Sequence, residues 1–259
     1  MSQRAGALFE ELIRTMERLR GPEGCPWDRA QTPKSLLPYL IEEAYEVVEA
    51  VHHSDPQELR EELGDLLLQV VFHAQMAREE GKFAIEDVVA GLTEKLIRRH
   101  PHVFGGARAE TPDEVVVRWE ALKQKEREES NSSLEGIPPS LPALMWAQRL
   151  QERAIALGFK WPDAGAALDK VREELEELAG VLAGGEKDRI AEELGDLLFT
   201  LVNVAILARV DAEQALRGAC RKFIERFQRV EAQLAFEGKT MEGQDLGYLL
   251  DLWRRAKEP

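Results

Sequence analysis

Cysteine is scarce in this chain, and the two residues that occur, Cys25 and Cys220, lie far apart. Neither has the paired spacing of a zinc or redox motif, so both are expected to be ordinary thiols. Long hydrophobic runs are also missing: no stretch approaches the roughly 18 apolar residues of a membrane span. The opening Met-Ser-Gln-Arg-Ala-Gly has no apolar signal region. A cytoplasmic protein without a membrane partner is therefore expected.

Basic residues are fewer than acidic residues. The chain carries 34 Lys+Arg against 48 Asp+Glu, which gives a formal net charge of −14 at pH 7. A nucleic-acid partner would need a broad basic face, so none is expected. An anionic substrate stays compatible with this charge if it arrives with a metal ion and meets locally placed basic residues.

Strand-like alternation is scarce too. Apolar residues recur at spacings of three and four, and glycine and proline fall between these periodic segments. The pattern predicts helices at about 5–20, 36–53 and 56–81, and again from 143 onwards. The fold class is therefore all-α, with two tandem helical-bundle domains. Their predicted bounds are 1–129 and 143–259, joined by a polar and proline-rich linker at 130–142.

One acidic pattern occurs twice. Residues 42–46 read Glu-Glu-Ala-Tyr-Glu and residues 62–68 read Glu-Leu-Gly-Asp-Leu-Leu-Leu. The corresponding stretches 131 residues later, 173–177 and 193–199, read Glu-Glu-Leu-Glu-Glu and Glu-Leu-Gly-Asp-Leu-Leu-Phe. Solvated helix faces have no reason to repeat in register, so the pattern indicates a duplicated site.

Helical geometry should bring these acids together. Residues three apart share a helix face, and the two helices of each pattern are joined by a short turn, so they run antiparallel. Four carboxylates then converge in each domain: Glu43, Glu46, Glu62 and Asp65 in the first, and Glu174, Glu177, Glu193 and Asp196 in the second. Mg²⁺, or Mn²⁺ in its place, would relieve their repulsion. Gly64 and Gly195 inside the pattern suggest a close approach that a side chain would block.

Basic and aromatic residues repeat as well. Lys95 and Arg99 match Lys222 and Arg226, and Trp119 and Lys123 match Trp253 and Lys257. A lysine–arginine pair on one helix face can hold phosphate oxygens, or it can complement the helix dipole. The tryptophans can stack on a base or fill the core.

The acidic residues followed by Lys-x-x-x-Arg resemble the MazG nucleotide pyrophosphohydrolases of the all-α NTP pyrophosphatase superfamily. The segments at 24–32, 100–104 and 140–144 are similar to that family too: Gly-Cys-Pro-Trp-Asp-Arg-Ala-Gln-Thr, His-Pro-His-Val-Phe and Ser-Leu-Pro-Ala-Leu. The resemblance covers essentially the whole chain. It implies Mg²⁺-dependent hydrolysis of nucleoside triphosphates to monophosphate and pyrophosphate, as nucleotide-pool housekeeping with broad base tolerance. It also implies a homodimer, whose bundles are completed by subunit pairing.

By motif position, the resemblance makes Glu174, Glu177, Glu193 and Asp196 the metal ligands. Glu173 would orient or deprotonate the attacking water. Lys222 and Arg226 would grip the phosphates, and Trp253 and Lys257 would close the nucleotide pocket. Either domain could carry the activity. The C-terminal domain is favoured, because a duplicated copy is free to drift into a structural role.

Two other classes of protein stay open. A di-iron carboxylate bundle also collects glutamates from several helices, but its Glu-x-x-His motif is missing from both acidic sets. A non-catalytic regulatory scaffold is the second alternative, and it suits one domain better than both.

Overall fold

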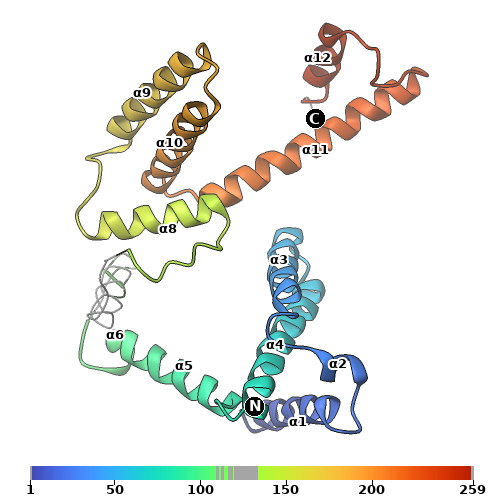
Figure 1. The fold of residues 1–259 in the computed structure, drawn as a ribbon, viewed down its shortest axis with the longest axis vertical. Helices are drawn as coiled ribbons and strands as arrows, with labels where there is room; N and C mark the ends of the chain where they lie inside the picture. Colours follow the sequence, from blue (N-terminus) through green and yellow to red (C-terminus); the bar gives the residue numbers. More distant parts are fainter. Residues whose placement is uncertain (1, 109–110, 112–113, 116–118, 120–133, 258–259) are drawn as a thin grey trace. The chain divides into compact units, whose positions relative to one another are not determined.

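The computed structural model describes residues 2–108, 111, 114–115, 119 and 134–257 (Figure 1). All regular secondary structure in this described part is helical. The chain divides into two compact units, unit 1 (Met1–Glu110) and unit 2 (Thr111–Pro259). The all-α prediction is thus confirmed, whereas the predicted linker at 130–142 lies partly outside the described residues and its bounds stay a prediction. Across the described helices, none is both long and apolar enough to cross a membrane.

Unit 1 is built around the antiparallel pair α3 and α4. Its helices are α1 (Ser2–Arg20), α2 (Pro26–Ala30), α3 (Leu37–His53), α4 (Pro56–Glu79), α5 (Ile85–Arg99) and α6 (Pro101–Phe104). Helix α4 packs against α3 and α1 (Figure 1). The predicted helices at 36–53 and 56–81 match α3 and α4 within two residues at each end.

The turn between α3 and α4 is short because each helix end is marked by its own residue. Ser54 adopts a left-handed conformation with φ 56° and ends α3. Asp55 caps α4, since its side chain accepts a hydrogen bond from the backbone N–H of Gln57 at 2.8 Å. Pro56 takes the first helical position, where its missing N–H costs nothing. The chain therefore reverses direction within two residues.

The core of unit 1 lies where α1 crosses α4. Met16, Leu36, Val71, Phe72 and Met76 form one buried cluster there. These side chains come from α1, α4 and the start of α3, so the cluster fixes α1 against the hairpin that carries the acidic residues.

Arg20 closes the edge of this core. Its side chain is 8% exposed and reaches Glu79 with a nitrogen–oxygen distance of 2.6 Å. The guanidinium also donates to the carbonyl of Asp28 at 2.5 Å and lies 5.3 Å from the centre of the Phe72 ring. Hydrogen bonding from Arg20 lowers the pKa of Glu79. One side chain thus joins α1, α2 and α4.

Unit 2 repeats the antiparallel pair as α9 and α10. Its described helices are α8 (Ala143–Ala156), α9 (Ala164–Leu182), α10 (Lys187–Leu207), α11 (Ala212–Phe236) and α12 (Leu246–Arg255). Gly185, with φ +71°, turns the chain between α9 and α10. Helix α8 packs across α10, in the way that α1 packs across α4.

The C-terminal end of unit 2 has its own small core. Val230, Leu234, Leu252 and Ala256 are buried together between the far half of α11 and α12. Figure 1 shows α11 running away from the α9–α10 pair towards α12. The far half of α11 is therefore held by α12, whereas other parts of α11 contact α8 and α10.

Substituting Arg20 should test how the edge of the unit 1 core is held. We expect Arg20→Met to lower the free energy of unfolding by about 1–3 kcal/mol, because hydrogen bonds to charged groups are lost. Denaturant unfolding of the full chain measures this change. Arg14→Met, an exposed position on the same helix, is the matched control. Equal unfolding midpoints for the two variants would contradict the role assigned to Arg20.

Candidate functional site

The acidic residues of unit 1 do converge. Carboxylate oxygens of Glu43, Glu62 and Asp65 lie within 4.8 Å of one another. Glu43 comes from α3, and the other two come from the facing side of α4. Glu46 lies close enough to Glu43 and Glu62 for its charge to raise the pKa of both carboxyls. The four predicted positions of unit 1 therefore form one group, which we call the unit 1 acidic cluster.

Electrostatics in this cluster is unfavourable without a cation. The pKa of Glu43 is raised by burial and by the charges of Asp65 and Glu46. The pKa of Glu62 is raised by burial and by the charges of Glu46 and Asp65. Carboxyl groups that raise one another's pKa are poised to accept a bound cation, which relieves their repulsion.

Unit 2 assembles the matching group. Carboxylate oxygens of Glu174, Glu177 and Glu193 lie within 4.8 Å of one another, and we call them the unit 2 acidic cluster. Glu174 is only 5% exposed. Burial and the charge of Glu174 raise the pKa of Glu177. The fourth predicted ligand, Asp196, is exposed on α10 and does not belong to this group in the described structure.

A lysine lies beside the unit 2 cluster. Lys170 Nζ lies 2.9 Å from a carboxylate oxygen of Glu174 and 2.7 Å from one of Glu173. These hydrogen bonds raise the pKa of Lys170 well above its usual range, so the ammonium stays charged. The Lys170 ammonium is thus fixed next to the buried carboxylate of Glu174.

An arginine lies near this cluster. Glu177 and Glu193 line a cavity of about 400 Å³ together with Arg189, Gly180 and Gly184. The lining of the cavity therefore includes both carboxylates and a guanidinium. This is a suitable environment for a metal ion and an anion bound side by side.

Sequence reasoning missed Lys170 and Arg189. Lys170 precedes Glu173 and Glu174 by three and four residues, a spacing that is usually an ordinary helix ion pair. The repeat itself held the signal. The positions 131 residues earlier are Tyr39 and Glu58, so unit 1 has no cation at either place. The two acidic clusters are alike, and their surroundings are not.

The predicted basic pairs come from other helices. Lys95 and Arg99 lie on α5, and Lys222 and Arg226 lie on α11. Neither Lys222 nor Arg226 forms an ion pair with a carboxylate in the part of the chain that the structure describes. The structure therefore does not bring the α11 pair to the acidic cluster of its own chain.

The predicted nucleotide-closing residues are only partly placed. Trp253 packs on the C-terminal core, with its ring centre 5.1 Å from that of Phe223. Lys257 follows α12 and is exposed. Trp119 is described only as a half-buried helical residue, and Lys123 lies outside the described residues. Their roles in binding stay predictions.

The expected close approach at the two mid-helix glycines is wrong for the described chain. A Cβ built on Gly64 or Gly195 meets no atom within 4 Å. Both glycines are exposed, so nothing in the same protomer requires the missing side chain.

The geometry defines an all-α protein with two repeated helical hairpins, each carrying a carboxylate cluster suited to a divalent cation. Comparison with known sequences agrees with it. Residues 31–104 and 165–230 each match the MazG nucleotide pyrophosphohydrolase domain. The chain therefore belongs to the MazG family, and the predicted tandem arrangement is confirmed.

Relatives that match 90% or more of this chain are named nucleoside triphosphate pyrophosphohydrolases. A Thermotoga maritima protein named nucleoside triphosphate pyrophosphohydrolase/pyrophosphatase MazG is 49% identical over 254 residues, covering 98% of this chain and 97% of the relative. The Escherichia coli nucleoside triphosphate pyrophosphohydrolase is 47% identical over 254 residues, covering 96% and 97%. A Mycobacterium tuberculosis protein of that name is 34% identical over 236 residues, covering 90% and 61%.

Metal-linked stability tests the acidic clusters. A cation that binds only the folded state should stabilise it by about 2.7 kcal/mol at 100 times its Kd. We therefore expect Mg²⁺ or Mn²⁺ to raise the melting temperature, and Glu43→Gln combined with Glu174→Gln to abolish the rise. Scanning calorimetry with and without metal measures this. Exposed Glu231→Gln on α11 is the control and should keep the response. A wild-type melting curve that metal leaves unchanged would contradict both sites.

Proposed function

We propose that this protein hydrolyses nucleoside triphosphates to nucleoside monophosphate and pyrophosphate with Mg²⁺. One observation carries the proposal. In this member of the MazG family, carboxylate oxygens of Glu174, Glu177 and Glu193 lie within 4.8 Å of one another, and Lys170 lies 2.9 Å from the buried Glu174. Hydrolysis of a phosphoric anhydride depends mainly on positioning and on charge stabilisation, and this arrangement supplies groups for both.

The residues present fit a hard divalent cation. Glu174, Glu177 and Glu193 offer only oxygen ligands, and Asp196, one turn beyond Glu193 on α10, is the proposed fourth. Mn²⁺ prefers the same ligands. When bound, the ion would polarise the phosphate and lower the pKa of a bound water. No cluster residue in either unit is histidine, which disfavours the di-iron alternative.

The remaining steps fall to charged side chains near the cluster. Lys170 pairs with Glu174, and Arg189 lines a cavity with Glu177 and Glu193. Both cations would neutralise the non-bridging phosphate oxygens. Glu173 holds the Lys170 ammonium in the described structure. If the Lys170 side chain moves from Glu173 to a phosphate of the substrate, the Glu173 carboxylate becomes free to orient the attacking water or to accept its proton.

Unit 2 is proposed as the catalytic unit. Both units have the carboxylates, but only unit 2 has cations at the positions of Lys170 and Arg189, where unit 1 has Tyr39 and Glu58. A substrate with four negative charges needs such partners close to the metal ligands. Unit 1 would then bind metal mainly as a structural site.

A homodimer is proposed because single units leave much apolar surface uncovered. Leu198 and Leu201 on α10, and Phe223 and Ile224 on α11, are between 44% and 54% exposed. Apolar helix faces of this size are usually covered by another helix. A second copy would cover them and would offer its own Lys222 and Arg226 for the phosphates.

Single ligand substitutions should separate the two units. We expect Glu177→Ala to lower kcat at least about 100-fold, because it removes a metal ligand from the proposed catalytic unit. Glu46→Ala, the equivalent change in unit 1, should lower kcat much less. The assay measures pyrophosphate and orthophosphate released from a panel of nucleoside triphosphates. Losses of about half in each variant would indicate two working sites, and orthophosphate as the product would contradict the proposed reaction.

Lys170 offers a second test of the catalytic unit. We expect Lys170→Met to lower kcat/KM by about 10–100-fold, since a charged partner of the phosphates is worth roughly 1.5–3 kcal/mol. The matched control is Arg172→Met on the same helix, where the arginine pairs with exposed Asp169. Equal activities of the two variants would remove Lys170 from the mechanism.

A further inference from the structure

Lys257 is predicted to close the nucleotide pocket, yet it lies beyond the last helical residue of α12 and is exposed. A long lysine side chain loses conformational freedom when it binds a ligand. A backbone that already points this side chain at the nucleotide reduces that cost, because less freedom is left to lose. The contacts that hold the backbone at Lys257 therefore affect how tightly the nucleotide binds.

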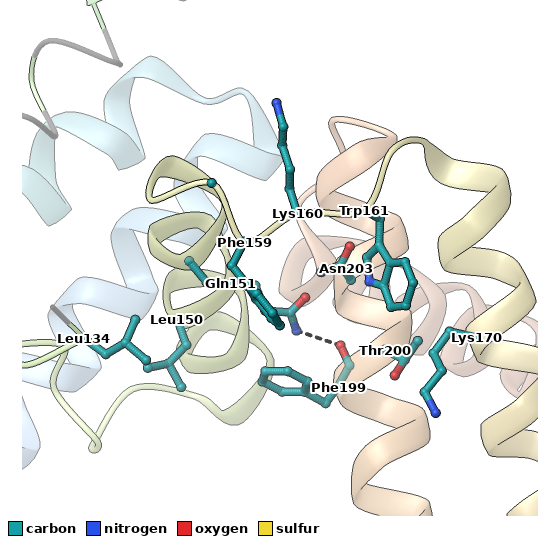
Figure 2. Close-up of a pocket in the computed structure, with 12 residues that line it drawn as sticks. Leu134, Leu150, Gln151, Phe159, Lys160, Trp161, Lys170, Phe199, Thr200 and Asn203 are labelled. Carbon is teal, nitrogen blue, oxygen red and sulfur yellow. Dashed lines mark hydrogen bonds between the residues drawn. The ribbon is translucent and has the colours of Figure 1, made fainter. Parts of the chain in front are cut away.

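A second cavity of unit 2 does not supply these contacts. It has a volume of about 570 Å³, and Figure 2 shows Phe159, Trp161 and Phe199 around it, with Lys170 at one side. Its described lining residues come from α8, α9, α10 and the segments beside them, and none belongs to α11 or α12. Helix α12 packs against α11 instead, so the surroundings of Lys257 are formed by these two helices.

The peptide group between Ala256 and Lys257 is held at both of its polar ends. Its N–H, which belongs to Lys257, donates to the carbonyl of Arg254 at 3.1 Å. Its oxygen, on Ala256, accepts a hydrogen bond from the guanidinium of Arg229 on α11 at 3.2 Å. A peptide group is planar, so holding both ends fixes the Cα atom from which the Lys257 side chain leaves.

Arg229 binds a backbone group that α12 itself leaves without a partner. The last carbonyls of a helix have no intrahelical donor, and Ala256 directly follows the last residue of α12. Ala256 is only 8% exposed and belongs to the same buried cluster as Val230, the residue after Arg229. The guanidinium therefore supplies a donor at a place where water has little access.

The other contacts of α12 do not involve Arg229. The ring centre of Trp253 lies 5.1 Å from that of Phe223 on α11. At the start of α12, the Tyr248 hydroxyl hydrogen-bonds to Glu237 and accepts from Lys239 Nζ at 3.2 Å. Loss of the Arg229 side chain should therefore change the position of Lys257 more than the docking of the helix.

Unit 1 has a different residue at the matching place. Lys95 and Lys222 are related by an offset of 127 residues, and the same offset relates His102 to Arg229. His102 lies in α6, after α5 has ended, whereas α11 continues without a break to Phe236. An arginine on a continuous helix is thus found at this place in unit 2, the proposed catalytic unit.

We infer that Arg229 is a positioning residue for nucleotide binding, an inference that rests on the proposed function. Its guanidinium holds the peptide group before Lys257, so the Lys257 ammonium meets the nucleotide with little loss of conformational freedom. Arg229 acts through Lys257 and does not itself contact the substrate. A purely structural role would change the stability of the fold and leave nucleotide binding unaltered.

Kinetics of the full chain with ATP and Mg²⁺ give KM and kcat, and isothermal titration gives the Kd of α,β-methylene-ATP, which resists cleavage between the α- and β-phosphates. Arg229→Met keeps a long side chain and removes the donor. We expect KM and Kd to rise about 10-fold with kcat within about twofold, because a contact made equally in the ground and transition states affects KM alone. Arg229→Lys keeps one donor, enough for a single carbonyl, and should stay within about threefold of wild type.

A double variant tests the link to Lys257. Lys257→Ala should itself raise Kd, and adding Arg229→Met to it should change Kd by less than about twofold, since the side chain that Arg229 positions is gone. The matched control is Arg254→Met, where an exposed arginine on α12 pairs with Asp251 at 2.6 Å, and it should leave KM and kcat unchanged. Tyr248→Phe loosens the start of α12 and should lower the melting temperature without changing KM.

The outcomes separate this inference from the proposed function. A wild-type Kd in Arg229→Met, with helical content unaltered by circular dichroism, overturns the inference. Effects that multiply fully in the double variant, or an equal rise in KM in Tyr248→Phe, overturn it too. If Arg229→Met loses its helical content, Arg229→Gln, whose amide is too short for the same contact, takes its place in each comparison.

Binding and cleavage can also give different results. Weaker binding of the analogue by Arg229→Met, in a chain that releases pyrophosphate from no triphosphate, supports the inference and overturns the proposed reaction. Pyrophosphate release by a chain whose KM and Kd do not depend on Arg229 supports the reaction and overturns the inference. A wild-type chain that neither binds the analogue nor cleaves ATP overturns both.

Discussion

Repulsion between carboxylates held at one height of a helical hairpin is the constraint on which the rest of this protein depends. In each unit, an antiparallel pair of helices brings glutamates from both helices within 4.8 Å. Burial and neighbouring charge raise the pKa of Glu43, Glu62 and Glu177, so ionising them near neutral pH opposes folding. The free energy gained from packing elsewhere must exceed this cost. A bound cation would remove the repulsion, so the clustered carboxylates favour metal binding.

The sequence predicted the hairpins well, because their determinants are local. Asp55 and Pro56 fix the start of α4 through a cap and a preset φ, whatever packs nearby. Acids at spacings of three then fall on one face by helical geometry alone. Repetition at a fixed offset added what a single acidic helix cannot give, namely a reason to treat these residues as a site. The convergence of Glu43, Glu46, Glu62 and Asp65 followed from these points.

Residues whose meaning depends on distant parts of the chain were harder to predict. Gln151 lies 48 positions from its partner Phe199, and nothing in the spacing of α8 indicates that they meet. Lys170 has the appearance of a surface ion pair until the burial of Glu174 is known. Gly195 was expected to admit a close neighbour, yet it faces open space, since a glycine in a sequence does not show what surrounds it.

The two repeated units carry different residues at equivalent positions. At one equivalent place, unit 1 has Arg20 fully paired across three helices, whereas unit 2 has Gln151 with an unpaired oxygen beside a cavity. Each unpaired buried oxygen costs about 1–3 kcal/mol, which selection for stability alone would remove. Natural proteins keep such costs mainly at functional sites. Unit 1 keeps such atoms too, on Gln69 and His73 of α4, so the feature that separates the two units is the positive charge of Lys170 and Arg189 beside the unit 2 carboxylates.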